Sequence, residues 1–253
     1  MKTILLFAFL SGCTACFCQE NSLFMTDSLI AVYKVKTRTK TINSISGYPY
    51  TVNHYSESGK LILTEILDDV NDSVMLRTTY FYNNMGLLDS SIMLKCGKYQ
   101  STFLIPNVYN KSIDALKNYY QYDQNNRLLK TVTKDDQYRL NYETLYTYDP
   151  YSYNILYYSL TGYVFKVVEC KFEHGKVPLG LVESELDETG KIINQSKTII
   201  TNSYNAYGQL ESANYESPDC KSNRKYSYYK NGLLKSKKKD KCSQNWTFSY
   251  TYY

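Results

Sequence analysis

Two histidines, His54 and His174, are the residues of this chain best suited to acid–base catalysis near neutral pH. Each lies at or beside a predicted hairpin turn, and neither is accompanied by a serine elbow or another nucleophile motif. Cys170 lies four residues before His174, a spacing that suggests a thiol–imidazole pair. The turn predicted between the two residues argues against such a pair and favours a disulfide or a buried thiol. We therefore expect surface histidines and no catalytic residue.

Clustered carboxylates are the other candidates for chemistry, because paired acids are what a glycosidase places across a sugar. They occur at residues 68–72, at Asp135 and Asp136, and at Asp187 and Glu188. All three clusters fall between predicted strands, where acids are ordinarily solvated and hydrogen-bonded to a turn. The first cluster lacks the ligand spacing of an EF-hand loop, and no phosphate loop, HExxH or dinucleotide fingerprint occurs. The sequence thus favours a protein that is not an enzyme and has no metal or cofactor, with an exported glycan hydrolase as an alternative.

A short unit recurs along the chain. Its clearest copies span residues 80–88, 120–128 and 226–234, and weaker copies span 55–61, 186–192 and 204–210. In every copy an aromatic residue or leucine lies four positions before a glycine or asparagine, and leucine or isoleucine lies two positions after it. Recurrence of one motif along a chain is typical of repeat architectures.

The unit has the composition of a strand, a tight turn and a second strand. Alternating tyrosines share one face of a strand, an Asp or Asn side chain caps the turn, and Gly or Asn adopts the left-handed conformation that closes it. We expect these turns between antiparallel strands at six residues: Gly59, Gly86, Asn126, Gly190, Gly208 and Gly232. A single hairpin is marginal in water, so the copies must stack to complete a core.

The unit resembles the YD (tyrosine-aspartate, or RHS) repeat, whose pattern is roughly Tyr-x-Tyr-Asp-x-x-Gly-Arg-Leu. Residues 120–128 match best and depart only where Asn126 replaces glycine. The resemblance implies an all-β fold, an antiparallel sheet of β-hairpin repeats that forms a meander, a curved sheet or a partial barrel. The proteins that carry such repeats also suggest an alternative function, that of a protective partner of a secreted toxin.

Outside the repeats, residues 31–41 and 163–172 are expected to be strands, and residues 112–117 a short helix. Most of the 29 tyrosines recur in register with the turns, which favours a structural role in the core. Aromatic rings also stack on sugars, and the tyrosines outside that register are the better ligand candidates: Tyr151, Tyr153, Tyr157 and Tyr158.

The N-terminus carries a predicted export signal. Lys2 precedes an apolar run, and small residues follow before Gln19, so we expect a signal peptide over residues 1–18 and the repeat domain over residues 19–253. The sequence around Cys13 also resembles a bacterial lipobox, and lipidation there would anchor the chain to a membrane. No apolar run is long enough for a transmembrane helix. We expect an exported protein that resides in the periplasm, on the cell surface or in the medium.

Positive charge is concentrated in the last hairpin. Residues 221–253 contain nine Lys or Arg residues and one acid, whereas residues 1–220 carry a net charge of −3. Such a patch suits an anionic component of the envelope, an acidic glycan or an acidic protein, and nucleic acid is not expected outside the cell. The alternative is that these lysines protect a sheet edge. We expect a non-enzymatic binding or structural role at the cell envelope, with these binding residues: Lys221, Lys225, Lys235, Lys237, Lys239 and Lys241.

The register of that hairpin predicts a disulfide. Opposed residues in an antiparallel pair have numbers with a constant sum, and pairing Tyr228 with Leu234 gives 462, the same sum as Cys220 and Cys242. Opposed Cα atoms lie about 4.5 to 5.5 Å apart, within disulfide range. The same sum sets Lys221 opposite Lys241 and Lys225 opposite Lys237 on the outer face, with Lys235 and Lys239 beside them.

We therefore expect a Cys220–Cys242 bond that contributes roughly 3 kcal/mol of stability in an oxidising compartment. Peptide mapping of the exported protein without reduction checks the bond. Two free thiols at these positions would show that either the register or the compartment is different.

Overall fold

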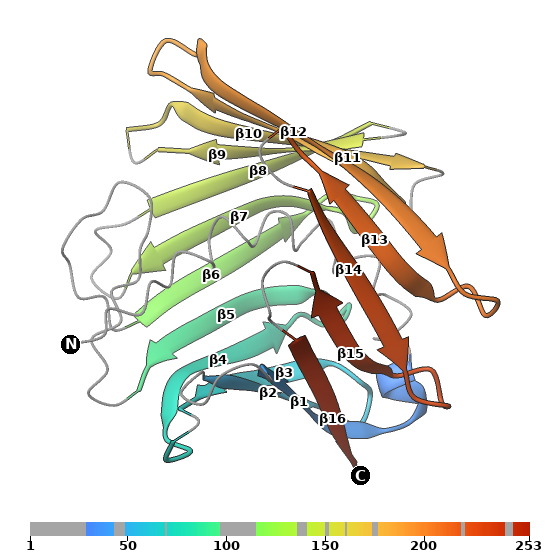
Figure 1. Ribbon diagram of the computed structural model, residues 1–253. Helices are drawn as coiled ribbons and strands as arrows, with labels where there is room; N and C mark the ends of the chain where they lie inside the picture. Colours follow the sequence, from blue (N-terminus) through green and yellow to red (C-terminus); the bar gives the residue numbers. More distant parts are fainter. Residues whose placement is uncertain are drawn as a thin grey trace.

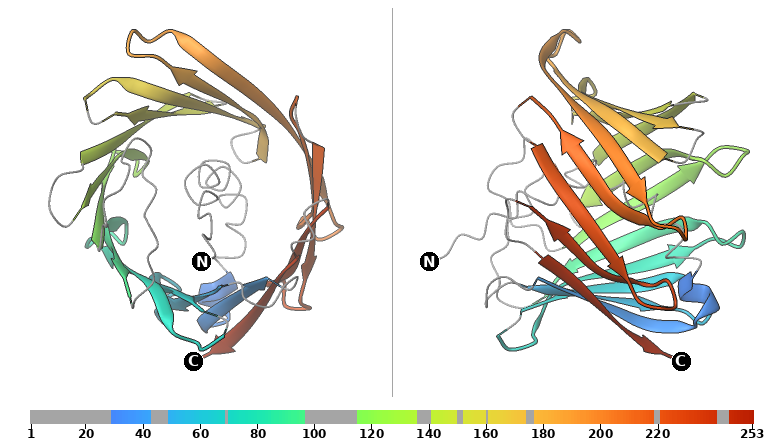
Figure 2. Two further views of the ribbon diagram at one scale, coloured as in Figure 1. Left: turned by 60° about the vertical axis from the view of Figure 1, so that its left-hand side comes forward. Right: turned by 45° about the vertical axis from the view of Figure 1, so that its right-hand side comes forward.

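The structure, a computed structural model, describes residues 29–42, 49–68, 70–96, 115–135, 141–149, 152–159, 161–173, 177–218, 221–240 and 245–253. Within these residues sixteen antiparallel strands follow one another in chain order, and the last pairs with the first to close a barrel (Figure 1). A view along the barrel shows the strands as a continuous wall (Figure 2). The predicted all-β antiparallel sheet of hairpins is confirmed, and the wall is closed rather than partial.

The strands have these bounds: β1 Val35–Ile42, β2 Tyr50–Tyr55, β3 Leu61–Leu67, β4 Val74–Tyr82, β5 Leu88–Lys95, β6 Ala115–Tyr122, β7 Leu128–Asp135, β8 Asn141–Asp149, β9 Ser152–Tyr158, β10 Val164–Glu173, β11 Val177–Leu186, β12 Ile192–Tyr204, β13 Leu210–Glu216, β14 Lys221–Tyr228, β15 Leu234–Lys239 and β16 Asn245–Tyr252. The strand predicted at residues 163–172 is β10. The strand predicted from Ala31 begins only at Val35, after a helical turn at residues 29–32. The helix predicted at residues 112–117 is wrong where it can be checked, since Ala115 opens β6.

All six predicted turns are present between antiparallel strands, with a positive φ at each predicted Gly or Asn. The Asp or Asn that opens the turn caps it as expected: Asp123 accepts hydrogen bonds from the backbone N–H groups of Asn125 and Arg127, both 2.8 Å long. These bonds, that of Arg127 foremost, lower the pKa of the Asp123 carboxyl. A further turn of this kind, from Ser159 to Gly162, lacks the aspartate and was not predicted.

Five of the turns lie at one end of the barrel, called here the turn end, because each follows an even-numbered strand; they contain Gly59, Gly86, Asn126, Gly208 and Gly232. The helical turn at residues 29–32 packs at this end, where Ile30 and Leu233 are fully buried in one cluster. Glycine is required at position 59, since a Cβ there would lie 2.6 Å from the Cβ of Ala31.

The two faces of the wall differ in burial. Directly opposed residues share a face, so the pairing assigns every paired residue to one face or the other. With the exception of Ser184, the buried residues of the paired strands all lie on the same face, and they include Leu76, Leu116, Ile155 and Ile200. Side chains converge on the concave side of a barrel and diverge on the convex side. The buried face is therefore the inner face, and it carries the tyrosines of the repeat.

Tyrosine hydroxyls join the five hairpins that contain the predicted turns of the turn end to the next strand. Each of these hairpins has a bulge at the first residue of its return strand, where the ladder is interrupted. In every case the carbonyl of that leucine accepts a hydrogen bond of 2.7 to 2.9 Å from a tyrosine of the following strand: Tyr82 to Leu61, Tyr122 to Leu88, Tyr148 to Leu128, Tyr228 to Leu210 and Tyr250 to Leu234. We call this set the tyrosine belt.

Removing a belt hydroxyl should destabilise the barrel. In Tyr148→Phe the carbonyl of Leu128 loses its donor, and we expect the free energy of unfolding to fall by about 1 to 3 kcal/mol. Urea denaturation followed by circular dichroism measures the change. The matched control is Tyr207→Phe, at a turn residue that is 84% exposed, which should leave stability unchanged. Equal effects of the two substitutions would contradict a role for the belt.

The same tyrosines predict unfolding in alkali. Burial raises the pKa of Tyr120, Tyr148 and Tyr228 from 10.0 to about 12. Between these values the unfolded chain has lost these protons while the folded chain keeps them, so stability is complete below pH 10 and falls as the pH rises through about 12. We expect the tyrosinate absorbance to rise over the same pH range in which the β-sheet circular dichroism is lost. Full ionisation near pH 10 with intact dichroism would contradict this.

Candidate functional site

Basic side chains form a diagonal row on the inner face of β14, β15 and β1. Arg224 and Lys239 are directly opposed, and Lys237 lies two residues nearer the turn end on β15. Across β16 the row continues on β1, first to Lys40 and then to Arg38. Each of these two residues lies two positions nearer the turn end than the cation before it. All five side chains are half-buried. We call these residues the inner basic row.

The described inner face around this row carries no acid. Among the described, paired residues of β13 to β16, β1 and β2, the inward side chains are basic, aromatic, aliphatic or uncharged polar. The wall at β10 and β11 differs, because there the inward Lys166 lies 3.3 Å from the inward Glu183. Positive potential therefore accumulates on one side of the lumen, and a concave low-dielectric wall strengthens such a field.

Aromatic rings lie beside nearly every cation of the row. Arg224 lies 4.2 Å from the ring centre of Tyr215, and Lys237 and Lys40 lie 5.3 and 5.9 Å from that of Trp246. Arg38 lies 5.8 Å from Tyr55. Ring faces attract cations, so these contacts hold the long side chains against the wall.

The guanidinium group of Arg38 has a donor without an acceptor among the described residues. Its Nε atom is buried and has no hydrogen-bond partner among the described residues. A guanidinium group has five donors and is permanently charged. A buried donor of this kind is costly unless it is satisfied, and an anion on the inner face would satisfy it.

The predicted binding lysines fall on both sides of the wall. Lys221, Lys225 and Lys235 are exposed. Lys237 and Lys239, predicted on the outer face, instead point inward with Tyr226 and Arg224.

The cause of this correction is a bulge next to Tyr228. The predicted pairing of Tyr228 with Leu234 is confirmed, but from Ser227 onward the paired numbers sum to 463, so Lys225 opposes Lys238 rather than Lys237. The constant-sum argument for a Cys220–Cys242 bond therefore fails. Both cysteines and Lys241 lie outside the described residues, so the bond itself stays a prediction.

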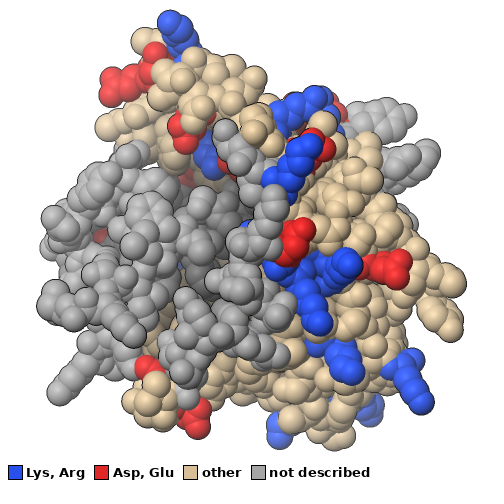
Figure 3. All heavy atoms as spheres, viewed as in Figure 1, with Lys and Arg blue, Asp and Glu red and all other residues tan. Residues whose placement is uncertain are grey.

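The idea that these lysines protect a sheet edge is wrong. β15 pairs with β14 and β16, and β16 also pairs with β1. A closed barrel has no edge strand to protect. The outer lysines gather over β14 and β15, where basic side chains dominate the molecular surface (Figure 3).

The other sequence candidates form no common site among the described residues. His54 is on the outer face with its Nε2 atom 3.0 Å from Glu65, which also binds Arg77. Asp68 and Asp187 cap turns as expected, but Asp135 ends β7 as a buried inward residue rather than a solvated turn acid. His174, Asp136 and Tyr151 lie outside the described residues.

Two of the tyrosines singled out as ligand candidates have structural roles. Tyr153 and Tyr157 pack against the core cluster of β9 to β12, which includes the fully buried Cys170. Tyr158 is half-buried at the end of β9. Cys96 is a free thiol and so does not pair with Cys170.

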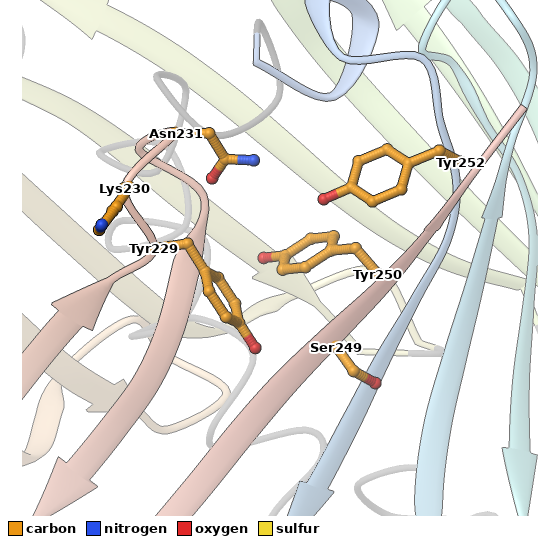
Figure 4. A pocket seen from close by; sticks show the side chains of 6 residues that line it. All are labelled: Tyr229, Lys230, Asn231, Ser249, Tyr250 and Tyr252. Carbon is orange, nitrogen blue, oxygen red and sulfur yellow. The ribbon is translucent and has the colours of Figure 1, made fainter.

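A pocket of about 550 Å³ opens at the seam between β15 and β16. The ladder of these strands has three residue pairs, and β16 continues beyond it toward the turn end. Tyr229 bridges the gap by donating a hydrogen bond to the Phe248 carbonyl. The rings of Tyr229, Tyr250 and Tyr252 face a common space, with Lys230, Asn231 and Ser249 around it (Figure 4).

In the part of the chain that the structure describes, no helix is long and apolar enough to cross a membrane.

No protein family model matches the chain, and no curated protein is significantly similar to it. Among solved structures, a porin-like protein from Bacteroides uniformis aligns over 86% of this chain and 98% of its own, with 9% identity and a TM-score of 0.40. The TcdB2-TccC3 complex aligns over 80% of this chain and 14% of its own, with 14% identity and a TM-score of 0.20. The Photorhabdus luminescens Tc holotoxin pore gives 12% identity, 83% and 15% coverage, and a TM-score of 0.19. Similarities this distant carry no argument about function.

Proposed function

We propose that this protein is an exported, non-enzymatic binding protein of the cell envelope that takes up an anionic component on the inner face of its barrel. The observation that carries the proposal is the inner basic row: five inward cations on adjoining strands, with no inward acid among the described residues of β13 to β16, β1 and β2. The buried Nε atom of Arg38 supports it, because an anion would supply the acceptor that this donor lacks.

The outer face of the same strands supports a wall that meets water. Its paired side chains are mainly serine, threonine, asparagine and lysine, and hydroxyl pairs such as Ser227 with Ser236 and Thr41 with Thr247 cross it. Lysine facing lipid would cost about 2 to 4 kcal/mol at the midplane of a membrane. The arrangement suits a barrel in an aqueous compartment of the envelope, where the predicted export signal would deliver it.

The repeat unit supports kinship with YD repeats. In the best copy the second tyrosine, Tyr122, joins the tyrosine belt, and the next residue, Asp123, caps the turn. The two most characteristic residues of the pattern thus have separate structural functions. Their recurrence therefore follows from their structural functions in the wall of the barrel.

Two matched double variants test the site. Lys237→Gln with Lys239→Gln neutralises two inward lysines, and Lys225→Gln with Lys238→Gln neutralises two directly opposed outward lysines of the same hairpin. We expect the native chain to bind dextran sulfate at low salt, and the inner variant to lose at least about tenfold in affinity. The outer variant should bind as the native chain does.

Circular dichroism should confirm that both variants fold. A larger loss in the outer variant would place binding on the outer surface, and absence of binding by the native chain would overturn the proposed function.

A further inference from the structure

The inner basic row has the length of a chain rather than of a single small anion. From Arg224 to Arg38 the row crosses three strand spacings and advances six residues along the strands. With strands about 4.8 Å apart and about 3.4 Å per residue, its ends are roughly 25 Å apart along the sheet. One phosphate or carboxylate can reach only neighbouring cations, such as the opposed Arg224 and Lys239.

Aromatic rings are interspersed with the charges along this path. Tyr226 is opposite Lys237, and Trp246 lies between Lys237 and Lys40 with both ammonium groups within 5.9 Å of its ring centre. Tyr250 is opposite Arg38, the cation of the row nearest the turn end. A ligand that follows the row therefore meets a ring beside nearly every charge, so it needs apolar surface as well as negative charge.

The row ends at the seam pocket. Tyr250, the partner of Arg38, lines that pocket together with Tyr252 and Tyr229. Ser249 of the outer face lines it too, so the pocket reaches both sides of the wall where the β15–β16 ladder stops. A chain that lies on the row can thus place its end in an aromatic pocket with access to the outside.

We infer that the inner basic row binds an extended strand of an acidic polysaccharide, with carboxylate or sulfate groups on the cations and sugar faces against the rings. This inference rests on the proposed function and adds the class and shape of the ligand. Single-stranded nucleic acid also combines charge with stacking. The predicted export favours the glycan, and an oligonucleotide therefore serves as a competing ligand in the test.

The only tryptophan of the chain, Trp246, lies within the row and reports on binding there. Its fluorescence would be followed in the full chain during titration with oligogalacturonates of increasing length, with calorimetry as the second measurement. We expect affinity to rise with length and then to level off once the oligomer spans the row. Neutral maltooligosaccharides of the same lengths should not bind.

Substitutions at the last cation of the row and in the seam pocket sharpen the test. Arg38→Gln should weaken binding of long oligomers about tenfold and bring the plateau to shorter lengths. Tyr252→Ala should weaken only the oligomers long enough to reach the pocket. The outward control Lys225→Gln should change neither the affinity nor the length of the plateau.

The outcomes separate this inference from the proposed function. Galacturonate alone binding as tightly as the longest oligomer would overturn the extended ligand, and tighter binding of the oligonucleotide would overturn the glycan. If dextran sulfate binds through the inward lysines but no oligogalacturonate binds, the inference fails and the proposed function stands. If neither binds, both fail.

Discussion

The barrel depends on a hydrogen bond between a tyrosine hydroxyl and the carbonyl at a bulge. Five hairpins of the turn end close with a left-handed residue, and the bulge that follows interrupts the ladder at a leucine. A buried carbonyl without a donor is costly, and the tyrosine hydroxyl supplies this donor. The tyrosine comes from the next strand, so each hairpin is completed only by its neighbour. Tyr250 on β16 extends this pattern to the last hairpin.

Closure of the barrel links the inward and outward alternation of side chains on each strand to that of every other strand. Because each strand pairs on both sides, the inward or outward direction of one side chain determines that of its partners around the barrel. One bulge therefore decides where charges lie. At Ser227 and Tyr228 it shifts the register by one residue and sends Lys237 and Lys239 inward, while Lys225 and Lys238 stay outside.

The inner basic row and the seam pocket follow from the way the chain closes. β1 and β14 are far apart in sequence, yet β16 pairs with β1 and β15, and this brings Arg38 and Lys40 next to the terminal hairpin. The short ladder between β15 and β16 leaves the opening that Tyr229 spans. The place where the two ends of the sheet join is thus also the place where basic and aromatic side chains gather.

The sequence by itself determined the hairpins, because their information is local. A glycine or asparagine at the left-handed position, with an aromatic residue or leucine before it and leucine or isoleucine after it, identifies six turns and the all-β class. The turn at Ser159 escaped because Val164 stands where the six copies have leucine or isoleucine. The sequence also located the excess of positive charge in the last hairpin. Only the tertiary structure decided that the sheet closes, that Arg38 and Lys40 join the site, and that Lys237 and Lys239 face the lumen. The reason is physical: a bulge inserts one residue without a distinctive side chain, and pairing between the first and last strands depends on the accumulated twist and register of all the strands between them.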